Sequence, residues 1–71
     1  MKYIIVESFD IPLAILFSEI LEHDKVANGR KCLSAGFCNV EGNTWGKSVS
    51  LGLSSKIEDK SIILDAINRT I

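Results

Sequence analysis

The sequence predicts an α+β fold for residues 1–71, taken as one small domain with a mainly antiparallel sheet. Two pairs of apolar, strand-like runs are each separated by a turn sequence, and a segment with helix signals follows each pair. A chain of 71 residues has room for one core. The expected order is therefore ββαββα: two hairpins, a short helix between them and a C-terminal helix, with both helices on one face of the sheet.

The first hairpin is predicted over residues 3–17. Residues 3–7 are rich in Ile and Val, residues 8–10 supply a turn, and residues 11–17 form an apolar second strand. Pro12 has no backbone donor, so we expect it at the beginning of its strand or on a free edge of the sheet.

A short helix is predicted after this hairpin. Ser18 is a suitable N-cap, and Asn28 with Gly29 should end the helix because both residues tolerate the left-handed conformation. His23 is the only histidine, and the acidic residues beside it point to different sides of a helix. We therefore interpret His23 as a surface residue.

The second hairpin, residues 31–40 and 44–53, allows two registers. A two-residue turn at Gly42 and Asn43 would mix apolar and small side chains on both faces of the sheet. An odd loop at residues 41–43 instead pairs Leu33 with Leu51 and Ser34 with Ser50. Burial of one face fixes the register more strongly than turn preference does, so the odd loop is predicted.

The most distinct helix signal lies near the C-terminus. Ser55 and Glu58 have the spacing of a capping box. The residues that follow form an apolar stripe at helical spacing: Ile62, Ile63, Ala66 and Ile67.

In the predicted register, one face of the second hairpin carries almost only small side chains. We call it the small-residue face; it is made by Cys32, Ser34, Gly36, Cys38, Gly46, Ser48, Ser50 and Gly52. It is too polar for an ordinary core and too poor in charge for an ordinary surface, so a ligand or partner is expected to approach it closely. The candidate binding residues are Ser34, Gly36, Trp45, Lys47, Ser48, Ser50 and Gly52. For Trp45, cross-strand packing is the alternative to ligand contact.

Charge and hydropathy exclude several classes of function. Eight basic and nine acidic residues give a formal net charge of −1, so nucleic-acid binding is not expected. No apolar run reaches the roughly 20 residues of a membrane span. Cys32 and Cys38 would lie roughly 20 Å apart on one strand, too far for a disulfide. Reduced thiols and no signal-peptide pattern indicate a cytoplasmic protein.

No catalytic apparatus is recognisable in the sequence. A nucleophile, a base and an orienting group do not occur together, and neither cysteine has an activating neighbour. No spacing of ligand residues suits a metal. The protein is therefore predicted not to be an enzyme, with no catalytic residues, no metal and no cofactor.

Two segments resemble a group of small proteins encoded in bacterial and phage genomes. They are the Ser-Ala-Gly-Phe-Cys strand at residues 34–38 and the Ser-x-Ser-Leu-Gly strand at residues 48–52, followed by Ser55, Glu58 and Asp59. The resemblance covers roughly the last forty residues and transfers no catalytic residue. It implies a phage or prophage setting, in which compact proteins without enzymatic motifs often bind a host factor.

These observations leave two hypotheses. The first is an interaction protein that forms a homo-oligomer and binds and inhibits a host protein, such as a defence complex. The alternative is an oligomer that binds or sequesters a small, nucleotide-like signal through backbone groups and serine hydroxyls of the small-residue face.

Overall fold

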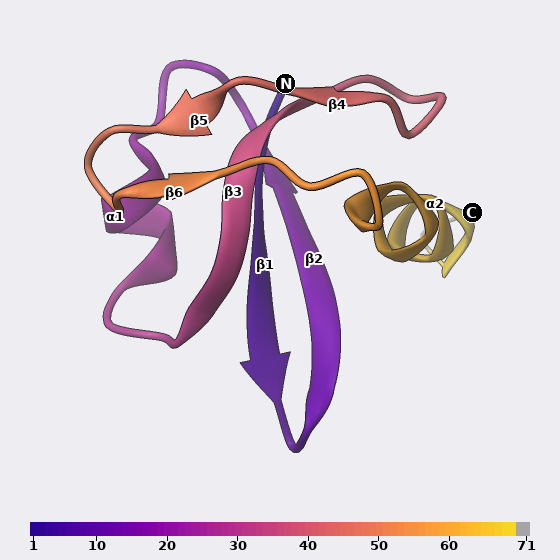
Figure 1. The fold of residues 1–71 in the computed structure, drawn as a ribbon, viewed down its shortest axis with the longest axis horizontal. Helices are drawn as coiled ribbons and strands as arrows, with labels where there is room; N and C mark the ends of the chain where they lie inside the picture. The colour runs from indigo at the N-terminus through magenta and orange to yellow at the C-terminus, as the bar shows by residue number, and fades with distance from the viewer. Residues whose placement is uncertain (70–71) are drawn as a thin grey trace.

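The computed structural model describes residues 1–69, and Figure 1 shows its α+β architecture. A four-stranded antiparallel sheet has the order β2-β1-β3-β4, and β5 and β6 form a separate ribbon. The elements are β1 Lys2–Ser8, β2 Ile11–Phe17, α1 His23–Ala27, β3 Cys32–Cys38, β4 Thr44–Trp45, β5 Lys47–Ser48, β6 Leu53–Ser54 and α2 Asp59–Arg69. The α+β class is confirmed, whereas the simple ββαββα order is not, because the expected fourth strand is divided into three short ones.

The two helices lie on opposite sides of the sheet, and not on one side as predicted (Figure 1). Alternate residues of β1 explain this arrangement. Tyr3 and Ile5 are buried with Ile63 of α2, whereas Ile4 and Val6 are buried with Ala27 of α1. Since successive side chains of a strand point to opposite faces, the central strand β1 carries two cores.

The first hairpin has the predicted place, but its turn is one residue shorter than the predicted residues 8–10, because Ser8 belongs to β1. Ser8 pairs with Ile11 across the two-residue turn of Phe9 and Asp10, whose φ values are 50° and 64°. Positive φ at both positions is the type I′ pattern. β2 is an edge strand of the sheet, so the expectation for Pro12 is confirmed.

The short helix begins later than predicted. Residues 18–21 form a turn instead, in which the Leu21 N–H donates to the Ser18 carbonyl at 3.1 Å. The Ser18 hydroxyl accepts a weak bond from the Ile20 N–H at 3.4 Å. Serine side chains that bond their own backbone in this way favour turns over helices. The predicted end is confirmed, because Asn28 is left-handed with φ 47°.

The second hairpin has an odd loop, but a longer one than predicted. Cys38 pairs with Thr44 and Phe37 with Trp45, so the loop is residues 39–43. The Asn39 side chain closes it by accepting the N–H groups of residues 41 and 43 at 3.0 and 3.1 Å. The chain then leaves the sheet at Gly46, which has φ 74°. The predicted pairs Leu33 with Leu51 and Ser34 with Ser50 are therefore wrong.

An irregularity in β3 also breaks the predicted alternation. Ile5 pairs with Ser34 but Val6 pairs with Cys32, so Leu33 is an extra residue. Leu33 packs with the Ile5 cluster, and Cys32 packs with the Val6 cluster. Cys32 therefore does not share a face with Ser34.

Helix α2 begins one residue beyond the predicted capping box. The Asp59 carboxylate, rather than Glu58, reaches back and accepts the Lys56 N–H at 3.1 Å. It also accepts the Tyr3 hydroxyl at 2.5 Å. Both Asp59 and Tyr3 are buried. Burial is the largest cause, and the hydrogen bond to this carboxylate the second, of a Tyr3 pKa well above its ordinary value. This pair fixes the start of α2 to the central strand.

Within the part of the chain that the structure describes, no helix has the length and apolar character needed to cross a membrane.

Candidate functional site: an apolar groove beside the first hairpin

The small-residue face of β3 is covered by the protein's own chain. A Cβ atom added to Gly36 would lie 2.7 Å from the Trp45 carbonyl oxygen and 3.0 Å from the Ser55 Cβ. Ser34 is buried, and its hydroxyl has no hydrogen-bond partner among the described residues. Both candidate residues therefore lie inside the fold, and the missing side chain of Gly36 lets Trp45 of β4 and Ser55 lie directly on β3.

Four other candidate residues gather on the β5–β6 ribbon. Ser48 is buried, accepts the Leu51 N–H at 3.2 Å and lies 3.3 Å from the Ser50 hydroxyl. Gly52 takes a positive φ of 67° at the end of the ribbon turn. Lys47 and Ser50 are exposed. In this ribbon the serines close a turn, so only part of the predicted set faces the outside.

Trp45 packs against the neighbouring strand, which is the cross-strand role predicted from the sequence as the alternative to ligand contact. Its ring stacks on Phe37, with centroids 6.4 Å apart. The Phe37 ring then meets His23 edge-on at 5.9 Å, and His23 meets Phe17 edge-on at 5.4 Å. This row of rings joins β4, β3, α1 and β2.

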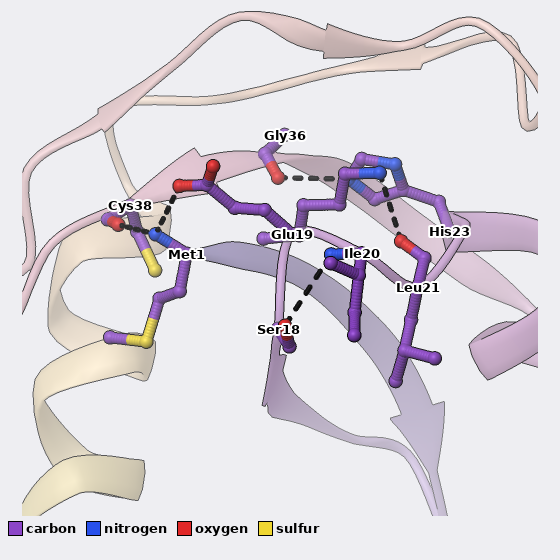
Figure 2. Close-up of polar contacts among 9 residues, drawn as sticks. Met1, Ser18, Glu19, Ile20, Leu21, His23, Gly36 and Cys38 are labelled. Atoms are coloured by element: carbon purple, nitrogen blue, oxygen red, sulfur yellow. Dashed lines mark hydrogen bonds and ion pairs between the residues drawn. The ribbon is translucent and has the colours of Figure 1, made fainter.

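His23 is buried, so its interpretation as a surface residue is wrong. Its Nε2 atom lies 2.9 Å from the Gly36 carbonyl oxygen (Figure 2). Because a carbonyl oxygen only accepts, Nε2 carries the hydrogen. In the same region the Lys2 ammonium donates to the Leu21 carbonyl, and the Met1 amino group contacts both the Cys38 carbonyl and Glu19. The turn after β2 is thereby held against the sheet.

A small pocket of about 370 Å³ lies beside His23. Two cationic side chains, Lys2 and Lys47, and one acidic side chain, Glu22, line it together with Ser50. This is where the structure brings together two of the predicted binding residues, Lys47 and Ser50.

A larger groove, about 680 Å³, lies between the end of the first hairpin and α2. We call it the hairpin groove. Pro12, Leu13 and Ala14 of β2 form one wall, and Ile62 and Ala66 of α2 form part of the other. In Figure 1 the hairpin turn projects alone at the bottom of the view, beyond the rest of the fold.

The charged side chains near the hairpin groove have partners. Glu7 pairs with Lys31 at 3.0 Å, and Asp65 pairs with Arg69 at 2.9 Å. Arg30 donates to the Val26 carbonyl at 2.9 Å. The hairpin groove therefore offers an apolar surface with two ion pairs on its rim and one cation, Arg30, that bonds carbonyl groups and no acidic side chain among the described residues.

Large apolar side chains are exposed at the rim and on the adjoining strand. Phe9 is 98% exposed, Ile11 58% and Leu13 36%. A Phe with positive φ is uncommon, and a fully exposed one buries no surface in return. All seven residues of β2 are apolar, although exposed edge strands usually carry charges that prevent pairing with other chains. Proline also hinders pairing with another chain, because it lacks a backbone N–H, and Pro12 is the only residue of β2 that protects the edge in this way.

The backbone of β2 also has unpaired groups on its free edge. A two-residue turn joins Ser8 and Ile11 by a hydrogen bond, so these residues form a bonded pair. Bonded and non-bonded pairs alternate along an antiparallel ladder. Pro12 and Ala14 are therefore in non-bonded pairs, and the Pro12 carbonyl and the Ala14 N–H point away from β1.

The structure gives the thiols an environment that suits packing. Cys32 and Cys38 are free, and burial raises the pKa of both thiols, offset in part by Arg30 and by the Met1 amino group respectively. A raised pKa lowers the fraction of thiolate, which is the nucleophilic form. Over residues 1–69, no group of three or more His, Cys, Asp or Glu side chains could hold a metal ion.

The two thiols should differ in alkylation. We expect iodoacetamide at neutral pH to modify the half-buried Cys32 slowly and to leave the fully buried Cys38 unmodified, with both reacting in urea. Intact-mass and peptide mass spectrometry measures this. Rapid modification of Cys38 in the folded protein would contradict the described burial.

The hairpin groove was not predicted from the sequence. Its one available signal was the uncharged run at residues 11–17 directly after the Phe9-Asp10 turn. With this geometry described, comparison with known proteins adds no further identification. No protein-family model, curated protein or solved structure matches the chain.

Proposed function

We propose that the protein acts by binding another polypeptide through the hairpin groove and catalyses no reaction. The observation that carries this proposal is the coincidence of three features at one end of the molecule: an apolar groove, exposed Phe9, Ile11 and Leu13, and an edge strand without charge. Exposed apolar side chains gathered in this way are typical of interaction sites.

The energetics favour an apolar partner. Burying a large aliphatic or aromatic side chain contributes roughly 1.5 to 3 kcal/mol. Three such side chains would offset a substantial part of the about 4 to 15 kcal/mol that association costs. The edge of β2 would add backbone hydrogen bonds to the interaction.

The resemblance to small phage and bacterial proteins supports a narrower proposal. In a phage or prophage setting, the bound polypeptide would be a host factor, and binding would inhibit it. A defence complex is one such target.

Substitution in the groove wall tests the proposal. Ala66→Arg places a long charged side chain in the groove, whereas Ile57→Arg changes a side chain that is 91% exposed and does not line the groove. In affinity capture from host cells, we expect a protein that is recovered with the parent and with Ile57→Arg to be depleted at least about tenfold with Ala66→Arg. Thermal melting of each variant controls for folding. Equal recovery with both variants would contradict the proposal.

A small-ligand function is the second candidate, and the pocket beside His23 favours it. Lys2, Lys47 and Ser50 give this pocket two cations and a hydroxyl against one acidic side chain, Glu22, and this excess of positive charge suits an anionic, nucleotide-like molecule. Native mass spectrometry of protein purified from its host tests this function. A retained small molecule that is lost in Lys47→Ala would support it, and a ligand-free parent protein would not.

A further inference from the structure

We infer that the pocket beside His23 binds a phosphate group that carries an O–H, with Lys2 and Lys47 holding its charge and the His23 ring accepting its hydrogen. The inference rests on the second candidate function, because it names a ligand class and a further binding residue for the same pocket. It does not depend on the hairpin groove, which is lined by other residues. Its basis is a buried imidazole with one ring nitrogen left without a partner.

His23 supplies the hydrogen-bond acceptor of the site. Its side chain is buried, and its Nε2–H donates to the Gly36 carbonyl at 2.9 Å. In the neutral ring the lone pair is then on Nδ1. Among the described residues Nδ1 has no hydrogen-bond partner, yet it is not one of the fully buried polar atoms without a partner, which belong to Asp24 and Ser34. Nδ1 therefore reaches solvent, and the pocket is the hollow that the His23 ring lines.

The ring is held in this orientation by its neighbours. Phe17 and Phe37 meet it edge-on from two strands, with centroids 5.4 and 5.9 Å away. Turning the ring over would also break the Nε2 bond and leave the Gly36 carbonyl without this donor. Nδ1 is therefore fixed as an acceptor before any ligand arrives, which reduces the cost of binding.

Two lysines supply the charge of the site. The Lys2 ammonium donates to the Leu21 carbonyl at 2.9 Å, which positions it and leaves two of its three hydrogens for a ligand. Lys47 is exposed and pairs with no acidic side chain in the part of the chain that the structure describes. Glu22 also lines the pocket and forms no ion pair with either lysine. The site therefore has a net positive charge with the ring neutral.

This combination of cations and an acceptor selects among oxyanions. At neutral pH both ionised forms of inorganic phosphate keep an O–H group, whereas sulfate, which has the same tetrahedral shape, has none. Phosphate satisfies the lysines and Nδ1 together. Sulfate would place an oxygen lone pair against the Nδ1 lone pair and leave that acceptor unpaired, so we expect the pocket to reject it.

Isothermal titration calorimetry of the purified protein at neutral pH, in a chloride buffer, tests the inference with inorganic phosphate and sulfate as probes. We expect phosphate to bind at least about fivefold more tightly than sulfate. Lys47→Ala should weaken phosphate binding at least about fivefold. Lys25→Ala is the matched control, because Lys25 is an exposed lysine of α1 that does not line the pocket. Its affinity for phosphate should equal that of the parent.

NMR of the ring nitrogens tests the role of His23 without replacing a buried side chain. The chain has one histidine, so the imidazole signals need no further assignment to a residue. We expect phosphate to shift the Nδ1 signal and to leave Nε2 bonded to Gly36, and sulfate to shift neither. Adenosine monophosphate, as a third probe, distinguishes the source of the phosphate group. Tighter binding than inorganic phosphate would identify a nucleotide, and weaker binding would identify free phosphate.

Two outcomes would overturn the inference alone and leave the second candidate function standing. These are sulfate binding as tightly as phosphate with both lost in Lys47→Ala, and phosphate binding that leaves the Nδ1 signal unchanged. If none of the three anions binds and the protein purified from its host carries no small molecule, the inference and the second candidate function are both wrong.

Discussion

Ile63→Ala is expected to lower the free energy of unfolding by about 2 to 5 kcal/mol, the range for removing a large aliphatic side chain from a core. Ile63 is fully buried and belongs to the same cluster as Tyr3, Ile5 and Cys38. It is the buried apolar residue through which α2 packs on the central strand. A domain of this size has a small free energy of unfolding, and a loss of this size would therefore leave much of the protein unfolded.

Urea denaturation measures the effect, with Ile57→Ala as the control. Ile57 is also an isoleucine but is almost fully exposed, so its replacement should change stability by no more than about 0.5 kcal/mol. Similar urea midpoints for the two variants would show that α2 does not pack on the sheet as described.

Asp59→Ala is expected to lower the free energy of unfolding by roughly 2 to 4 kcal/mol, because a buried donor left without an acceptor typically destabilises a protein by about 1 to 3 kcal/mol. The buried carboxylate accepts both the Tyr3 hydroxyl and the Lys56 N–H, so its removal leaves the buried Tyr3 hydroxyl and the part-buried Lys56 N–H without this acceptor. It also removes the group that caps the start of α2.

Two further variants separate these contributions. Asp59→Asn keeps an acceptor oxygen for one donor and should lose less stability than Asp59→Ala. Tyr3→Phe removes the hydroxyl but keeps the ring in the core. In a double-mutant cycle, the effects of Asp59→Ala and Tyr3→Phe should therefore be less than additive. Strict additivity in chemical denaturation would mean that the two side chains do not interact.

The elements with strong local signals were predictable from the sequence. The first hairpin follows from β-branched residues around a turn. The missing donor of Pro12 required either the start of a strand or a free edge, and the structure places its strand at an edge. The apolar stripe of α2 was also predictable, and Ile63 lies in the core as expected. In these segments, local preference and tertiary packing agree.

The second hairpin was not predictable, because single side chains decide its path. Asn39 lengthens the loop by bonding two N–H groups, and Gly46 turns the chain out of the sheet. Leu33 adds a bulge that reverses the alternation in β3. None of these events changes the hydrophobic pattern on which the predicted register depended.

The small residues of β3 were recognised, but the structure gives them a different role from the predicted one. Gly36 is small because the backbone at Trp45 lies against it, so enlarging Gly36 should disturb the fold before it disturbs any partner. The hairpin groove was missed because its walls come from β2 and α2, which are far apart in the sequence. No local pattern reports such a juxtaposition.

Site-specific photo-crosslinking in the cells that express the protein tests the central claim most directly. The photoreactive amino acid p-benzoylphenylalanine replaces Phe9 at the groove rim or, as a control, the equally exposed Ile57. We predict a covalent polypeptide adduct from position 9 that is absent from position 57 and is lost in the Ala66→Arg background. The mass of the adduct distinguishes a second copy from another protein. No adduct from position 9, or equal adducts from both positions, would contradict binding through the hairpin groove.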